Sequence, residues 1–445
     1  MNLLTLSWKN LVNKPLNMAL SLILFALGVG LISFMFNLDR QIEENFNKNL
    51  AGVDLVIGAK GSPMQMILCN MYHVDNPTGN IPLEKARAFL NPSHPLISVA
   101  VPLSLGDSYR GYRIAGTTYD ILELYGAELA QGKLWAQVME ATVGAAVADA
   151  LHLHIGDTFK SSHGLVEGIE EHEHDFKVVG ILKPTGSVID QLILTPTESI
   201  WESHAHHGEG ADVAEGDTAD HDHHHDHHHG KHVHKTEPPT VYDSLALRKL
   251  AEEDRLRLME ATDMDITSIL IRFRSRTNIQ ALNMGRNINE NTDLMAASPP
   301  NEIARLQTNL GQGTFALKML AVVIVVVSGL SIFISLFSSL KDRKYELALL
   351  RVMGGSPSTL FNLILLEGLL LAILGYFLGI LMSHAGLTAL AVFMKNAYRY
   401  SFTGFKFIPV EGLLLGGALF VGLLAALIPA IQAGKTDISE TLAKG

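Results

Sequence analysis

The side chains best suited to chemistry gather in one stretch, residues 203–239, which holds twelve of the chain's twenty histidines. Neutral imidazole nitrogens bind Zn, Cu, Ni and Co, and the acidic residues between them would add negative charge. The stretch has no apolar periodicity, so we expect a disordered insert that captures metal without one fixed geometry. A solvated loop with no metal function is the alternative. The metal candidates are His221, His223, His224, His225, His227, His228, His229, His232 and His234.

We expect no required cofactor. Zn or another divalent metal is the ion that the histidine-rich insert would bind. Two smaller groups of residues offer weaker metal sites. The first reads as a charged hairpin loop and the second as hydrophobic core, because Met usually fills gaps in a core, although its thiol and thioethers could hold Cu(I). The first group is His163, Glu167, Glu170, Glu171, His172, Glu173, His174 and Asp175, and the second is Met64, Met66, Cys69, Met71 and His73.

A second candidate site, for a protein partner, is the stretch from Lys341 to Pro357, KDRKYELALLRVMGGSP. It lies between two apolar runs, 319–340 and 360–382, each long enough to cross a hydrocarbon core of about 30 Å. Its excess of Lys and Arg marks a cytoplasmic loop, and its apolar spacing predicts a short amphipathic helix that ends at Gly354 and Gly355. Such a helix could dock a soluble partner or serve as a plain positively charged anchor, and the residues alone leave both open.

Six residues of this stretch form the pattern E-x-x-L-L-R-x-x-G-x-S: Glu346, Leu349, Leu350, Arg351, Gly354 and Ser356. The pattern resembles the signature after the second membrane helix of FtsX-like ABC transporter permeases, the MacB / LolC / FtsX superfamily with the type VII ABC transporter fold. The resemblance implies that these six residues couple the permease to a separate ABC ATPase subunit. It also implies a second permease copy or a paralogue, as a dimer.

Two further stretches carry the resemblance. The ordered series from Ile114 to Gly180, with Gly132, Gly144 and Gly156 between them, is similar to the periplasmic core domain of MacB-like permeases. Residues 429–442 resemble the family's closing pattern, P-A-x-x-A-x-x-x-D-x-x-x-x-L.

The same tail contains the end of a phosphate-binding loop, Gly434-Lys435-Thr436, but the first glycine of that motif would fall at Pro429. We therefore expect no nucleotide site and a non-catalytic subunit, with ATP hydrolysis in a separate chain.

The composition agrees with a membrane protein of two or three domains. The chain has 445 residues, 48% of them hydrophobic, and a mean hydropathy of +0.22. A single cysteine, Cys69, excludes an internal disulfide. The net charge of −11 falls mostly in the histidine-rich insert, which argues against nucleic acid as a partner.

We expect an α-helical membrane protein with four transmembrane helices and a large α+β extracytoplasmic domain inserted between helices 1 and 2. A short interfacial helix is expected before the first transmembrane helix, and its residues Leu3, Leu6, Trp8 and Leu11 would share one apolar face. Two small-x-x-x-small pairs, Gly375 with Gly379 and Gly412 with Gly416, would permit close helix contacts. The expected segments are a cytoplasmic interfacial helix 1–15, transmembrane helix 16–37, the MacB-like domain 38–314 with the insert 203–239, transmembrane helix 315–340, the cytoplasmic coupling loop 341–358, transmembrane helix 359–390, an extracytoplasmic loop 391–410, transmembrane helix 411–432 and a cytoplasmic tail 433–445.

The function expected from these features is that of an ABC transporter permease subunit in the inner (plasma) membrane. It would transmit the ATP-driven movement of its ATPase to the extracytoplasmic domain, in contact with membrane lipid and with a periplasmic partner protein as a further candidate. The alternative is a membrane-anchored, extracytoplasmic metal-binding sensor or chaperone without an ATPase partner.

The charges at Lys9, Lys14 and Lys341 predict that both termini are cytoplasmic and that the domain after the first membrane helix lies outside. Reporter fusions at Gly111 and Gly355 should therefore report opposite compartments. Finding both reporters on the same side of the membrane would refute this topology.

Overall fold

The computed structural model describes residues 3–13, 15–164, 171–204, 244–398 and 402–435, and these form two compact units. The first unit joins residues 1–44 to residues 307–445, and the second consists of residues 45–306. The boundaries between the units fall inside two helices, α2 (Pro15–Leu50) and α10 (Pro299–Asp342), so both chain connections between the units are helical.

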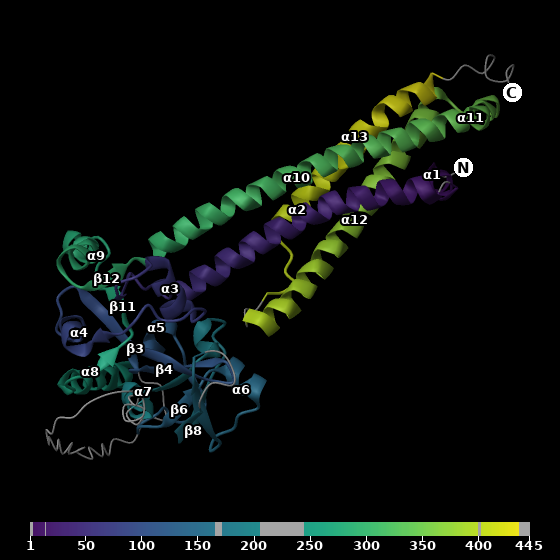
Figure 1. The fold of residues 1–445 in the computed structure, drawn as a ribbon. Helices are drawn as coiled ribbons and strands as arrows, with labels where there is room; N and C mark the ends of the chain where they lie inside the picture. Colours follow the sequence, from purple (N-terminus) through teal and green to yellow (C-terminus); the bar gives the residue numbers. More distant parts are fainter. Residues whose placement is uncertain (1–2, 14, 165–170, 205–243, 399–401, 436–445) are drawn as a thin grey trace, which may run out of the picture. The chain divides into compact units, whose positions relative to one another are not determined.

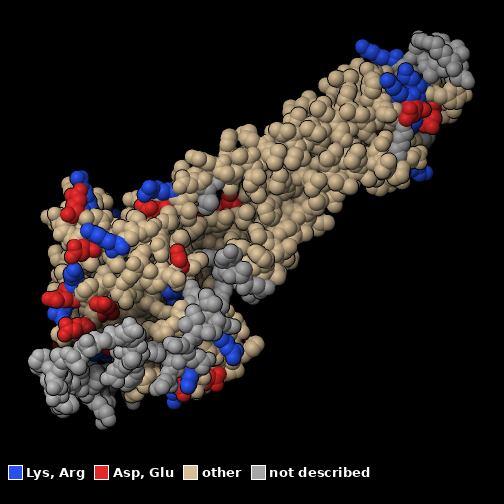
Figure 2. Space-filling model, viewed as in Figure 1, with Lys and Arg blue, Asp and Glu red and all other residues tan. Residues whose placement is uncertain are grey.

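The first unit is built from helices (Figure 1). Besides parts of α2 and α10 it contains α1 (Leu3–Val12), α11 (Lys344–Val352), α12 (Pro357–Tyr398) and α13 (Pro409–Gly434). Four of these, α2, α10, α12 and α13, are long and apolar enough to cross a membrane. Charged side chains gather near the ends of these helices and are sparse along them (Figure 2). The prediction of four candidate membrane helices is confirmed, and α2 and α10 continue well beyond their apolar runs.

The long helices approach one another closely where glycine removes a side chain. A Cβ added at Gly379 of α12 would lie 2.7 Å from the carbonyl oxygen of Ala26 in α2, and one added at Gly30 would lie 2.8 Å from the carbonyl oxygen of Gly379. A Cβ added at Gly375 would lie 2.7 Å from a ring carbon of Phe25 in α2. The predicted contact at Gly375 and Gly379 is therefore present, between α12 and α2.

The second predicted glycine pair behaves differently. A Cβ added at Gly412 or Gly416 would have no atom within 4 Å among the described residues. The close approach of α13 to α12 occurs at Gly422, where an added Cβ would lie 2.5 Å from the Cβ of Ala372. Within the described residues this pair therefore makes no close helix contact, because glycine spacing alone does not say which face of a helix meets a neighbour.

The first helix, α1, packs on α12 through a face that is partly polar. Its buried residues are Ser7, Asn10 and Leu11, and the Ser7 hydroxyl donates to the carbonyl oxygen of Leu363 over 3.3 Å. Trp8 is 46% exposed and lies with Leu4 and Val12 on a separate apolar face. The expectation that Trp8 shares the face of Leu3, Leu6 and Leu11 is therefore wrong, because hydrogen bonding to α12 selects the face with Ser7 and Asn10.

The second unit is a mixed α+β domain around one ten-stranded sheet with the order β12-β1-β11-β3-β4-β9-β6-β8-β5, and β7 pairs with β3 and β8. The sequence predicts strands from the apolar runs at residues 54–57, 96–105, 112–115, 176–182, 191–194 and 267–273, and each run overlaps a strand of this sheet. The sheet strands are β1 (Leu55–Ala59), β3 (Ile97–Tyr109), β4 (Tyr112–Thr117), β5 (Leu129–Gly132), β6 (Glu140–Val143), β7 (Thr158–His163), β8 (Glu171–Leu182), β9 (Ile193–Pro196), β11 (Ser268–Phe273) and β12 (Leu294–Ala297), and β2 (Ile81–Pro82) pairs separately with β10 (Asp265–Ile266).

Both faces of the sheet are covered. Successive residues of a strand point to opposite faces, and Val56 of β1 belongs to one core cluster while its neighbours Leu55 and Ile57 belong to another. Leu270 of β11 and its neighbours divide in the same way. The domain helices are α3 (Pro63–Tyr72), α4 (Leu83–Leu90), α5 (Asp120–Tyr125), α6 (Ala145–Leu151), α7 (Thr197–His204), α8 (Ser244–Glu260) and α9 (Ile279–Asn291), with the 3-10 helix η1 (Val188–Gln191).

The two helices that flank residues 205–243 are joined to each other. Arg257 of α8 forms a 3.0 Å ion pair with Glu198 of α7, and Arg255 of α8 lies 3.2 Å from Asp120 of α5. Burial raises the pKa of Asp120 to about 6, and Arg255 offsets part of that cost. These ion pairs connect α8 to α7 and to α5.

The glycine contacts predict a difference between two Gly→Ala substitutions. Gly379→Ala should destabilise the helical unit by about 1–3 kcal/mol, as overpacking does, because its Cβ meets backbone atoms of α2. Gly416→Ala should be neutral or stabilise by up to about 1 kcal/mol, since alanine favours a helix. Thermal unfolding of the two purified full-length variants in one detergent measures this difference, and equal melting temperatures would contradict the helix contact.

Candidate functional site

The coupling pattern lies on and just after α11, a short helix between α10 and α12. Tyr345, Val352 and Met353 are 54%, 61% and 68% exposed and form an apolar surface on this helix. Exposed apolar groups of this kind mark interaction surfaces. Four residues of the coupling pattern share the exposed surface: Glu346, Leu349, Gly354 and Ser356.

The opposite face of α11 holds it to the other helices. Leu347 and Ala348 are buried, and Leu347 belongs to an apolar cluster with Leu340 of α10 and Leu360 of α12. Leu350 is only partly buried and packs against this cluster. Leu350 therefore serves the packing of α11, whereas its neighbour Leu349 faces outward.

The turn after α11 needs glycine at one position. Gly354 has φ of +99°, a backbone conformation that side chains with a Cβ rarely adopt. The amide of Gly355 donates to the carbonyl oxygen of Leu350 over 2.9 Å and closes the end of the helix. The glycine of the coupling pattern thus has a structural reason to be there.

A polar chain of contacts leads from the exposed face of α11 into the helical unit. Arg343 precedes α11 and bonds to Glu346 over 3.1 Å. It also lies 3.5 Å from a carboxylate oxygen of Glu367 in α12. The same oxygen accepts a 2.7 Å hydrogen bond from the Asn10 amide of α1. Since the Glu367 side chain is almost fully buried, these contacts tie α11, α12 and α1 together.

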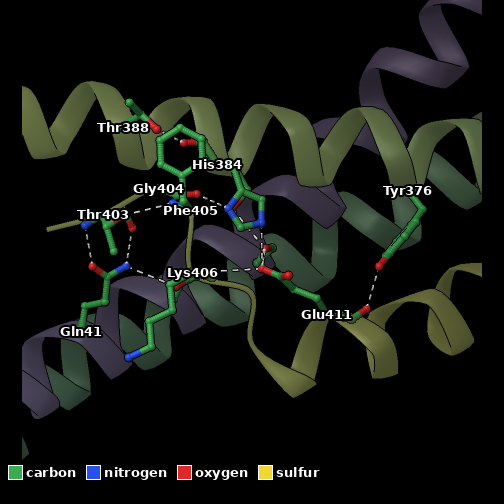
Figure 3. Close-up of polar contacts among 12 residues, drawn as sticks. Gln41, Tyr376, His384, Thr388, Thr403, Gly404, Phe405, Lys406 and Glu411 are labelled. Carbon is green, nitrogen blue, oxygen red and sulfur yellow. Dashed lines mark hydrogen bonds and ion pairs between the residues drawn. The ribbon is translucent and has the colours of Figure 1, made fainter.

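A second polar network surrounds Glu411 at the start of α13 (Figure 3). One carboxylate oxygen accepts hydrogen bonds of 3.1 Å from both Ser33 and Asn37 of α2. The same oxygen lies 3.2 Å from Nε2 of His384 in α12, and the Tyr376 hydroxyl donates to the Glu411 carbonyl oxygen over 3.0 Å. Glu411 therefore joins α13 to α2 and α12.

His384 contacts acceptors through both ring nitrogens. Its Nδ1 lies 2.5 Å from the carbonyl oxygen of Gly404, and its Nε2 faces Glu411 (Figure 3). His384 therefore links the segment before α13 to the carboxylate of Glu411.

The segment before α13 is tied to α2 as well. Gln41 donates to the Thr403 carbonyl oxygen over 2.9 Å and accepts from the Thr403 amide over 2.9 Å (Figure 3). Asn37 donates to the carbonyl oxygen of Lys406, and the Lys406 ammonium pairs with Glu44. Of the expected extracytoplasmic loop 391–410, residues up to 398 continue α12, and the part around Thr403 and Lys406 is held on α2.

The nine metal candidates from His221 to His234 lie outside the described residues. Of the charged group from His163 to Asp175, residues Glu171 to Asp175 belong to strand β8, because the ladder with β7 extends to Ser162 opposite Glu171. The sequence had suggested a hairpin loop, and for these residues that prediction is wrong. In the group from Met64 to His73, Met66, Cys69 and Met71 are fully buried in the domain core, and burial raises the pKa of the Cys69 thiol to about 11. This confirms the expectation that these residues are hydrophobic core.

Several functional candidates were not identified from the sequence. Arg343, Glu367 and Glu411 were part of no motif, and Asn10 was seen only as part of an interfacial helix. An ionisable residue inside an apolar run is a signal in itself, since such residues are rare in membrane helices and lie where function or packing needs them. That signal marks Glu367 and Glu411, but it does not name their partners.

Two family models match the chain. The model of the FtsX-like permease C-terminal region matches residues 318–438, which include α11 and the whole coupling pattern. The model of the MacB-like periplasmic core domain matches residues 18–222. Both models thus match the regions in which the sequence showed the resemblance.

One curated relative is the ABC transporter permease YtrF of Bacillus subtilis (strain 168). It is 27% identical over 131 residues, which cover 26% of this chain. The match spans 29% of the length of that relative.

The network around Glu411 predicts a large effect of one substitution. Glu411→Ala would remove the acceptor that Ser33, Asn37 and His384 share, so it should destabilise the helical unit by about 1–3 kcal/mol. Glu44→Ala is the control, because its ion pair with Lys406 is partly exposed and such pairs contribute about 0–1 kcal/mol. Both effects can be measured by thermal unfolding of the full chain in detergent. An equally small decrease in melting temperature in both variants would show that the network adds little to the stability of the helical unit.

Proposed function

The chain belongs to the MacB/FtsX type of ABC transporter permeases, and from this premise we propose that it is the non-catalytic permease subunit of an ABC transporter. Its role would be to transmit the ATP-driven movement of separate ATPase subunits to its extracytoplasmic domain. The observation that carries this proposal is α11, a short helix between two candidate membrane helices with an exposed face that no described residue covers.

The contacts of α11 support transmission rather than simple anchoring. A partner that bound Glu346 and Leu349 would also act on Arg343, which bonds to Glu346 and approaches Glu367. From Glu367 the contacts continue to Asn10 of α1. A push on the exposed face would therefore reach α12 and α1 through buried, directional contacts.

The partners follow from the same premise. An ABC ATPase subunit would dock on α11 from the cytoplasm, with both termini on that side of the inner membrane. A second permease copy or paralogue would complete the dimer. The outward face of α10 carries Val322, Val323, Val326 and Val327, each about half exposed, and this face would contact lipid or the second copy.

We also propose that the histidine-rich segment 203–239 binds divalent metal, zinc first, without assigning zinc as the cargo. This segment is the feature that favours the second candidate function, a membrane-anchored metal-binding sensor or chaperone that has no ATPase. The two functions differ in whether an ATPase accompanies the chain.

The test alters the exposed face of α11 while leaving its packing face intact. Glu346→Lys and Leu349→Asp should each weaken ATPase binding by about 2 kcal/mol or more, as loss of a central interface residue does, which is roughly 30-fold. The full-length permease would be purified from its native membrane, and the amount and ATP hydrolysis of the accompanying ATPase measured.

The matched control is Glu260→Lys, which makes the same charge change on an exposed residue of α8. It should leave ATPase binding unchanged. Undiminished binding and hydrolysis in both α11 variants would argue for a plain anchor. Absence of any ATPase from the purified native protein would favour the sensor.

A further inference from the structure

Three potential metal ligands from three separate elements meet on the extracytoplasmic domain. Asp107 lies on β3, His163 ends β7, and His204 ends α7. The strand register places Asp107 directly opposite His163, and residues opposite one another on neighbouring strands have adjacent side chains. The helix α7 packs on β3 and brings His204 to the same place. The fold, not the spacing in the sequence, therefore assembles this group.

The distances are close to those of a metal site. Nε2 of His204 lies 3.1 Å from Oδ1 of Asp107, and Nδ1 of His163 lies 3.7 Å from the same oxygen. One ligand atom from each of the three residues lies within 4.8 Å of the others. Zinc bonds of about 2.0–2.1 Å in a tetrahedron set ligand atoms roughly 3.3 Å apart. Small rotations of the two imidazoles would bring all three ligands to bonding distance.

The burial of the three side chains gives the group an inner and an outer side. The carboxylate of Asp107 is fully buried, whereas the side chains of His163 and His204 are 33% and 37% exposed. The hydroxyl of Ser203 donates to the second carboxylate oxygen of Asp107 over 3.0 Å. Such an outer hydrogen bond orients a ligating carboxylate. The imidazoles border solvent, so an ion could enter, and water could complete the coordination.

We propose that Asp107, His163 and His204 form a binding site for one divalent metal ion, and that this ion is zinc. Two imidazoles and a carboxylate are a donor set that zinc accepts, with three protein ligands and one open position. The alternative is a surface His–Asp cluster that stabilises the fold without binding metal. Two features favour the metal: the two imidazole nitrogens converge on one oxygen, and the carboxylate below them is buried and oriented by Ser203.

The chain order adds a reason for this position. His204 is followed by the histidine-rich segment, and His163 is followed after one glycine by an acidic stretch with Glu167 and Glu170. The site is therefore joined covalently to the parts of the chain that are richest in metal ligands. Tethering of this kind raises the effective concentration of a ligand at a neighbouring site. The inference does not rest on the proposed ATPase coupling and survives its failure.

The test must separate this site from the histidine-rich segment. In the full-length protein the eleven histidines from His206 to His234 are replaced by asparagine, which leaves His204 in place. Calorimetry with zinc should then show one remaining ion per chain. Cobalt(II) in the same protein should give the strong visible absorption of a tetrahedral site.

The deciding variant adds His163→Ala and His204→Ala to this background. Zinc affinity should fall by more than the roughly 10–100-fold typical of changes outside the ligand shell, and the tetrahedral cobalt absorption should disappear. Zinc should also raise the melting temperature of the background but not that of the variant. His154→Ala is the matched control, because His154 also lies 3.7 Å from an aspartate, Asp157, but is 82% exposed. It should keep zinc binding.

Two results would overturn the proposal. One is the absence of zinc binding and of tetrahedral cobalt absorption in the background protein. The other is zinc binding that stays unchanged in the double variant. If the double variant does not fold, the cobalt spectrum of the background still tests the proposal, since a weak octahedral spectrum would contradict the tetrahedral site with three protein ligands.

Discussion

A membrane interior offers no water, so every polar side chain inside the helical unit has to find its partner within the protein. The carboxylate of Glu367 meets this demand with Asn10 and Arg343, and the carboxylate of Glu411 meets it with Ser33, Asn37 and His384. Each network joins helices that are far apart in the sequence. These polar contacts fix α1, α2, α11, α12 and α13 against one another, together with the close helix contacts at Gly379 and Gly422.

Much of the helical unit could be predicted from the sequence, because long apolar runs and a positively charged loop have few alternative explanations. The short helix at Glu346 followed from its amphipathic pattern and from the glycines behind it. The assignment of Leu349 to the exposed face and Leu350 to the packing face could not be made, since it depends on how α11 is rotated against α10 and α12. The same limit applies to Gly412 and Gly416, whose spacing could not show that the close contact of α13 with α12 lies at Gly422 instead.

The extracytoplasmic domain shows a second limit. Its strands were visible as apolar runs between turn residues, yet nothing in the sequence pairs Asp107 with His163 or brings His204 beside them. Register and the packing of α7 on β3 decide this, and both are set by the core as a whole. The metal ligands that the sequence displays most openly, from His221 to His234, lie outside the described residues, whereas the convergent ones come from residues that no pattern singled out together.

The contact between Asn10 and Glu367 spans 357 residues of sequence. At synthesis rates of about 5–20 residues per second, the first helix emerges from the ribosome roughly 20–70 s before its partner. Throughout this interval the polar face of α1 has to remain hydrated at the membrane surface, where water can stand in for the missing carboxylate. α1 can therefore dock through Asn10 only after this part of α12 has been made.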